Sequence, residues 1–308
     1  MRFPYVGSGP YCYTNSLTMV LGAKAPGTHI VECLTGSPFG VQLIGGTVPF
    51  FDPYGWDPEI GLNAAVELLG LRCERTEGGS PEDAAKRLRA ASEQGPVLVG
   101  PLDMGLLLHQ PGSGTAQGAD HYVVVLEVTE DMVVFHDPHG HPYASMPSDA
   151  FMEAWRADEV AYIETPYVMR TGFLREREVA PADALRASLP AAASWLAGRY
   201  DLPNAPGSSG GADALAELSG RLERGLDPET RHMLESFGLR AGARRLSDAA
   251  TCFDLIGLSG AAEAAAAQAR RLGALQYELV TGNDKAVAAG LRALAPGYDR
   301  LRELIEAA

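Results

Sequence analysis

Two patterns of apolar positions divide the chain near residue 178. Before this point, short β-branched runs such as residues 121–128 and 132–135 alternate with stretches rich in Gly and Pro, a pattern typical of strands joined by turns and loops. After it, apolar residues recur three and four positions apart in Ala-rich segments, which is the spacing of amphipathic helices. The pattern predicts an α+β domain over residues 1–178, followed by an all-α helical domain over residues 179–308.

The first region is expected to contain a helix at residues 12–22 and a β-hairpin downstream. Gly and Pro precede Cys12, and apolar residues then recur at helical spacing up to Gly22. The hairpin has strands at residues 121–128 and 132–135 and ends at Asp137. Further helices are predicted at residues 57–69, 80–94, 182–189, 212–225, 228–237, 243–256, 261–279 and 284–307, with a break at Pro296. Asp57 and Ser80 are expected to cap the first two of these helices. Further strands are predicted at residues 96–102, 160–164 and 167–170.

Three residues in these elements have the types needed for nucleophilic catalysis. Cys12 begins a helix, where unpaired backbone N–H groups stabilise a thiolate. His121 begins one hairpin strand and Asp137 ends the other, so both side chains are expected at the same end of the hairpin. A His that reaches the thiol acts as a base, and a carboxylate behind it fixes its tautomer. We therefore predict a catalytic triad of Cys12, His121 and Asp137.

Other Cys and His residues have less specific settings. Cys33, Cys73 and Cys252 show no comparable context and are predicted to pack in the interior. A cluster at His136, Asp137, His139 and His141 has an alternative interpretation as a divalent metal site. Asp137 follows a strand and precedes Pro, the place expected for the triad carboxylate, and strand alternation should direct His136 away from it. We predict no metal and no bound cofactor.

The stretches around these residues resemble known families. The matching segments are Tyr11–Leu17, Asp57–Gly70, Gly95–Asp103 and His121–Pro138. Their order is similar to that of papain-like bacterial cysteine peptidases of the bacteriocin-processing type, and more similar still to the butirosin biosynthesis protein H family. In that family a papain-like domain precedes a helical domain. The resemblance covers roughly residues 5–170 and is weak in the remainder.

This resemblance implies transfer of an acyl or aminoacyl group rather than proteolysis. The donor would be a thioester on the phosphopantetheine arm of an acyl carrier protein, and a small-molecule amine would accept the group in natural-product biosynthesis. Cys12 would be the nucleophile, His121 the general base and then acid, and Asp137 the orienting group. Two alternatives remain open: a cysteine hydrolase, either peptidase or thioesterase, with the same triad, and a non-catalytic binding protein on a papain-like fold.

One departure from the peptidase pattern concerns the oxyanion. Papain-like peptidases carry a Gln several residues before the nucleophile, whereas residues 4–10 of this chain contain none. The backbone N–H of Cys12 is one expected donor, and Ser8 is a candidate for another. A thioester is more reactive than an amide, so the missing Gln weakens the peptidase interpretation more than the transferase interpretation.

Charge and composition limit the partners. The formal net charge is −14, which argues against nucleic acid and against anionic membrane surfaces. Two loose basic clusters are candidate contacts for an acidic carrier protein, although an ordinary solvated face is the favoured interpretation of both: Arg170, Arg175 and Arg177, and Arg240, Arg244 and Arg245. The start of the chain lacks the apolar segment of a signal peptide, and a thiolate mechanism requires reducing conditions, so we expect a cytoplasmic protein. The helical domain is expected to cover the cleft, bind the acceptor or form a homodimer, and a purely structural role is the alternative.

Overall fold

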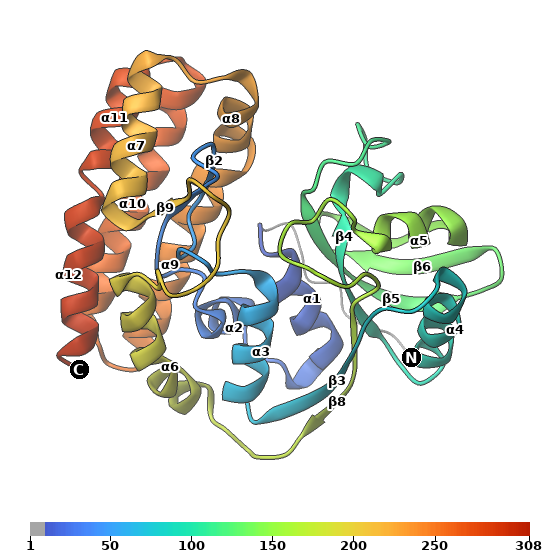
Figure 1. Ribbon diagram of the computed structural model, residues 1–308. Helices are drawn as coiled ribbons and strands as arrows, with labels where there is room; N and C mark the ends of the chain where they lie inside the picture. The colour runs from blue at the N-terminus through green and yellow to red at the C-terminus, as the bar shows by residue number, and fades with distance from the viewer. Residues whose placement is uncertain (1–9) are drawn as a thin grey trace. The chain divides into compact units, whose positions relative to one another are not determined.

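The computed structural model describes residues 10–308, which form two compact units (Figure 1). Unit 1 comprises the described residues up to Thr28 together with Gly70–Glu178, and unit 2 comprises His29–Leu69 and Val179–Ala308. The chain leaves unit 1 after Glu178, where the sequence analysis placed a boundary. Residues 29–69 differ from that division: they belong to unit 2 because apolar side chains such as Val41, Leu43 and Phe51 pack into the core of its helices.

Unit 1 is built on a six-stranded antiparallel sheet. The strand order is β3-β8-β4-β5-β6-β7, and each neighbouring pair is antiparallel. The strands are β3 (Leu71–Thr76), β4 (Val97–Asp103), β5 (Asp120–Val128), β6 (Met132–Asp137), β7 (His141–Pro147) and β8 (Met169–Arg175). The hairpin predicted at residues 121–135 is therefore the centre of a meander, β5-β6-β7.

Three helices accompany this sheet: α1 (Cys12–Leu21), α4 (Pro81–Ser92) and α5 (Ser148–Arg156). Helices α4 and α5 share one apolar cluster with alternate strand residues such as Val123, Val125 and Phe135. Helix α1 lies against β5, where the Ser16 hydroxyl donates to the backbone oxygen of Tyr122 at 3.1 Å. Because successive strand residues face opposite sides, α1 meets the side that carries Tyr122. The beginning of α1 is thereby fixed beside the hairpin.

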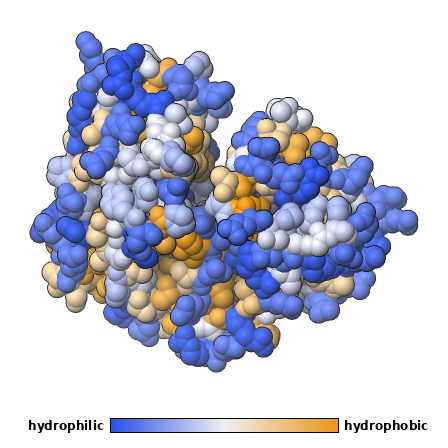
Figure 2. All heavy atoms as spheres, viewed as in Figure 1, coloured by the Kyte–Doolittle hydropathy of each residue, from blue (hydrophilic) through white to orange (hydrophobic). Residues whose placement is uncertain are grey.

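Unit 2 is mainly helical. Its helices are α2 (Thr28–Thr35, beginning at the last residue of unit 1), α3 (Pro58–Leu68), α6 (Pro181–Ala197), α7 (Gly211–Arg224), α8 (Pro228–Met233), a π-helical turn at Leu234–Gly238, α9 (Leu239–Leu255), α10 (Ser259–Val280), α11 (Asp284–Arg292) and α12 (Ala295–Glu306). Three short strands, β1 (Gln42–Ile44), β2 (Val48–Phe50) and β9 (Ser209–Gly210), form a small antiparallel sheet. The visible surface of α7 and α11 is largely hydrophilic (Figure 2), as expected of amphipathic helices around an apolar core.

The fold class predicted from the sequence is confirmed: an α+β region with antiparallel sheets precedes an all-helical region that begins near residue 209. The predicted caps are also present, since Asp57 accepts from the Ile60 N–H and Ser80 from the Asp83 N–H. The break near Pro296 is confirmed as well, because α12 begins at Ala295. In residues 10–308, no helix combines the length and apolar character needed to cross a bilayer.

Local prediction was wrong in the stretch between residues 141 and 164. Residues 160–164 are not a strand, because the chain turns after α5, where Ala157 has a positive φ of 53° and the Val160 N–H donates to the Ala157 oxygen. Residues 141–147, for which no element was predicted, form β7, and the unpredicted helix α5 follows directly. Strand β7 contains two Pro residues and few apolar ones, so its sequence lacks a strand signal; pairing with β6 determines it.

Candidate functional site

The carboxylate of Asp137, at the end of β6, is the centre of the site. The side chain is fully buried and accepts four hydrogen bonds. Its Oδ1 accepts from His121 Nε2 at 2.6 Å and from the His139 backbone N–H at 2.7 Å. Its Oδ2 accepts from His109 Nε2 and from Gln110 Nε2, each at 2.7 Å. Burial alone would raise the pKa of this carboxyl, but the charge on His121 and these hydrogen bonds hold the pKa far below its usual range.

His121, at the start of β5, pairs with this carboxylate as the sequence analysis expected. The two residues are brought together by the β5–β6 register, in which Val124 lies opposite His136. Burial by itself would lower the pKa of the imidazole. Attraction to Asp137, together with hydrogen bonds to Asp137 and Cys12, outweighs burial and raises the pKa of His121 to about 10. His121 therefore carries a positive charge near neutral pH.

Cys12 is the first residue of α1 and is partly exposed. Its thiol lies within interaction range of His121 and contributes to the raised pKa of that imidazole. Since Nε2 of His121 is bonded to Asp137, Nδ1 is the ring nitrogen left for the thiol. The structure thus brings together all three residues that the sequence analysis selected, in the order thiol, imidazole, carboxylate.

Two further contacts to Asp137 were missed by the sequence analysis. His109 and Gln110 lie in the loop between the 3-10 turn η2 (Met104–Leu106) and β5, where the sequence predicted no helix or strand. His109 is nine-tenths buried, and its ring packs edge-on against Phe135 at a centroid distance of 5.0 Å. A His-Gln pair within a Gly-rich loop has no periodicity, so nothing in the sequence signalled that these side chains turn inward.

The base of this loop is held by a second buried carboxylate. Asp103, at the end of β4, accepts from the backbone N–H groups of Gly105, Gln117 and Gly118 at 2.9 to 3.1 Å. Only glycine fits at position 105, because a Cβ there would lie 2.1 Å from the backbone oxygen of Thr115. The loop is consequently pinned at both ends while it presents His109 and Gln110 to Asp137.

The remaining histidines of the predicted cluster separate. His136 faces Tyr143, whose backbone N–H donates to His136 Nδ1 at 3.0 Å, while Asp137 contacts His121 and His109; this is the alternation expected of a strand. His141, at the start of β7, instead joins His109, with perpendicular rings and a centroid distance of 5.2 Å. His109, Asp137 and His141 form a group whose ligand atoms all lie within 4.8 Å of one another. The group itself contains no cysteine.

The other predicted features have simpler outcomes. Cys33 and Cys252 are buried, as predicted, whereas Cys73 is partly exposed. Ser8, the candidate oxyanion donor, lies outside the described residues. Each arginine cluster has one buried member, Arg170 or Arg245, and Arg244 pairs with Asp248 at 3.1 Å. A contact with an acidic carrier protein stays a prediction.

Comparisons with known proteins find relatives of this chain but name no activity. Residues 204–306 match the family described as the YobF C-terminal domain. A search of curated proteins finds a relative in Bacillus subtilis (strain 168), the "Uncharacterized protein YobF", at 34% identity over 161 residues. The match covers 51% of this chain and 52% of the relative, so the chain spans about half the length of the curated relative. Over half its length, therefore, this chain is homologous to YobF, and its helical C-terminal region is similar to the YobF C-terminal domain.

Proposed function

We propose that unit 1 is a papain-like cysteine acyltransferase that uses Cys12, His121 and Asp137. One observation carries the proposal: a thiol at a helix start interacts with an imidazole that is itself hydrogen-bonded to a buried carboxylate. Nucleophilic catalysis by cysteine needs this order, because the base must reach the thiol and must itself be oriented by a third group. The resemblance to the butirosin biosynthesis protein H family supports transfer to an amine.

The proposed first half-reaction forms an acyl-enzyme. The Cys12 sulfur, as thiolate, attacks the carbonyl carbon of an acyl thioester carried on a phosphopantetheine arm. The negative charge that develops on the carbonyl oxygen is stabilised by the backbone N–H of Cys12 at the start of α1. The new carbon–sulfur bond persists, the bond to the donor sulfur breaks, and the departing thiolate takes the proton from the His121 imidazolium.

The second half-reaction returns the enzyme to its starting state. A small-molecule amine attacks the acyl-enzyme carbonyl and loses one proton to the now neutral His121. The bond to Cys12 breaks, and the thiolate is released beside the restored imidazolium. The sum converts an acyl thioester and an amine into an amide and a free thiol. We place this chemistry in the cytoplasm, where reducing conditions keep the nucleophile as a thiol.

Intact-protein mass spectrometry tests the proposal directly. The protein is incubated with a panel of acyl thioesters on a carrier protein and on a short pantetheine arm. We expect a mass increase of one acyl group that disappears when an amine is added, with the acylated amine as product. The matched control is Cys73→Ala, which removes the other partly exposed thiol of unit 1 and should leave the adduct unchanged, whereas Cys12→Ala should abolish it.

The other outcomes identify the rivals. An adduct that clears equally fast in water alone, without amide product, would make the protein a thioesterase or peptidase with the same three residues. Intact donors across the whole panel, with no adduct on Cys12, would overturn the proposal in favour of a binding protein that retains the fold.

A further inference from the structure

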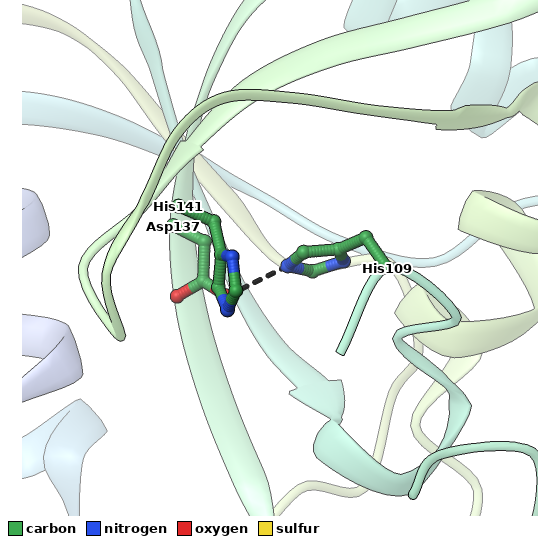
Figure 3. A group of neighbouring side chains, drawn as sticks. All are labelled: His109, Asp137 and His141. Atoms are coloured by element: carbon green, nitrogen blue, oxygen red, sulfur yellow. Dashed lines mark hydrogen bonds and ion pairs between the residues drawn. The ribbon is translucent and has the colours of Figure 1, made fainter. Parts of the chain in front are cut away.

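The group formed by His109, Asp137 and His141 has features that the proposed cysteine chemistry does not use. Figure 3 shows the His109 ring, from the loop, pointing toward Asp137 and His141 on their neighbouring strands. Each residue offers one nitrogen or oxygen atom to a common space, and these atoms lie within 4.8 Å of one another. Hydrogen bonds to His121 explain the position of Asp137, but they do not explain why two more imidazoles gather on its other side.

The fold holds the three side chains in place from separate elements. Asp137 and His141 are directly opposite each other in the β6–β7 pairing, so their side chains start from adjacent backbone positions. His109 is buried against Phe135, and its Nε2 reaches Asp137 Oδ2 at 2.7 Å. Two strands and one pinned loop thus converge on one point, which is the rigidity that a metal site requires.

The hydrogen-bonding capacity of the two imidazoles is not exhausted by the protein. Nε2 of His109 faces Asp137 and is the nitrogen that would bind an ion, whereas Nδ1, which is buried without a hydrogen-bond partner among residues 10–308, takes no part in the site. The His141 ring makes an edge contact with His109, and the part of the chain that the structure describes provides no hydrogen bond to its nitrogens. An ion bound to a nitrogen of each ring would give both imidazoles a partner, and the Asp137 carboxylate would be its third ligand.

We propose that His109, Asp137 and His141 form a three-ligand site for a divalent ion of the zinc class. Two imidazoles and one carboxylate suit Zn²⁺, whereas Mg²⁺ and Ca²⁺ prefer oxygen ligands alone. Three protein ligands leave a fourth position for water or another small ligand. Tetrahedral Zn²⁺ with bonds of about 2 Å separates its ligand atoms by roughly 3.3 Å. Ligand atoms spread over at most 4.8 Å therefore need only small side-chain movements.

This site is distinct from the thiol–imidazole pair, although both share one carboxylate. Oδ1 of Asp137 contacts His121, and Oδ2 contacts His109. An ion on the Oδ2 side replaces the hydrogen bond from His109 and leaves the contact with His121 in place. The main rival location for Zn²⁺ is the pair formed by Cys12 and His121, since thiolate and imidazole are also zinc ligands. The proposal does not depend on acyl transfer.

The test is direct metal binding to the full-length protein after treatment with a chelator. Zn²⁺ is titrated in competition with a chromophoric chelator, and Co²⁺ is added separately to read the ligands from its absorption spectrum. We expect one equivalent to bind to the wild type and equally to Cys12→Ala. The affinity should fall by at least about 10²-fold in His109→Ala and in His141→Ala. His232→Ala, on α8, is the matched control and should bind as the wild type does; Mg²⁺ should not compete.

Two results would overturn the proposal. The first is equal Zn²⁺ affinity in the wild type, His109→Ala and His141→Ala. The second is loss of binding in Cys12→Ala, together with a sulfur-to-cobalt charge-transfer band in the wild type, which would place the ion on the thiol. His141 is partly exposed, so His141→Ala keeps the test valid even if the buried His109 cannot be replaced without unfolding.

Discussion

Each unit of this protein contains a buried cluster of charged side chains, and the two clusters are completed differently. In unit 1, the Asp137 carboxylate is saturated by four hydrogen bonds, but its partners are not. His121 has a second ring nitrogen that meets the partly exposed thiol of Cys12. His109 has a second nitrogen without any partner in the described chain. The imidazoles of this cluster can therefore still bind another atom.

In unit 2, the corresponding centre is the guanidinium of Arg245, which is 2% exposed. Its Nε donates to Glu32 at 3.0 Å, and NH1 donates to Asp52 at 3.1 Å and to the backbone oxygen of Phe51 at 2.9 Å. The ring of Trp56 lies 5.8 Å from the guanidinium carbon. The two carboxylates have additional donors of their own, in Ser37 and Gln42.

The two clusters differ in whether their side chains can still bind another group, which is a requirement of a reactive site but not of a structural one. A buried charge whose neighbours are themselves fully bonded holds elements together, because moving any member leaves another charge unpaired. A buried charge can act on a reacting group or on an ion when its hydrogen-bonded neighbours can still bind another atom. The contrast supports the proposed chemistry at the cluster around Asp137 and indicates a structural role for the cluster around Arg245.

The largest expected effect is the loss of activity in Cys12→Ala. Without the sulfur no acyl-enzyme forms, and the transfer rate should fall by about 10⁴-fold or more. The melting temperature should change little, since Cys12 is partly exposed. Transfer kinetics and thermal unfolding on the same samples check this pair of outcomes. Activity that survives the substitution would remove the basis for treating unit 1 as the reactive half.

Asp137→Asn is expected to lower the transfer rate by about 10³- to 10⁴-fold, because an amide cannot stabilise the His121 imidazolium or fix its tautomer as a carboxylate does. Single-turnover acylation of Cys12, followed by mass spectrometry, measures the effect. Asp131→Asn is the matched control: this carboxylate lies exposed in the turn of the same hairpin and should have no influence. Equal rates for the two variants would contradict the proposed role of Asp137.

Arg245→Ala should destabilise unit 2 by about 3–5 kcal/mol, because it leaves two buried carboxylates without their counter-charge. Arg244→Ala, its neighbour, removes an ion pair with Asp248 in which the arginine is half exposed, so we expect less than about 1 kcal/mol. Urea unfolding of both variants provides the comparison. Similar midpoints would mean that the Arg245 cluster contributes little to cohesion.

The smallest expected effect concerns the two confirmed helix caps, one in each unit. Ser80→Ala, at the start of α4 in unit 1, and Asp57→Ala, at the start of α3 in unit 2, should each cost about 1 kcal/mol. Native-state hydrogen exchange, read separately in α3 and α4, shows whether each loss stays within its own unit. Exchange that accelerates in both units for either variant would show that they unfold together.

Signals carried by a few neighbouring residues were sufficient for much of the site. A Gly-Pro stretch before an apolar run predicted the helix start at Cys12, and β-branched runs predicted the hairpin that carries His121 and Asp137. These predictions succeeded because helix starts and hairpins are local structures, and a hairpin brings its two outer ends together. The same locality explains the failures: β7 depends on pairing with β6, and residues 160–164 follow a turn imposed by α5.

By itself, the sequence determined the succession of an α+β region and a helical region and the two helix caps, and it selected Cys12, His121 and Asp137 as the residues of the proposed site. Only the tertiary structure decided that His109 and Gln110 turn onto Asp137 and that residues 29–69 join the helical unit. It also decided that Arg245, which donates to Glu32 across 213 positions of sequence, is a core residue rather than a surface cation. The physical reason is the range of the interactions: periodicity and capping act over one or two turns of chain, whereas burial and the pairing of charges depend on neighbours that only folding supplies.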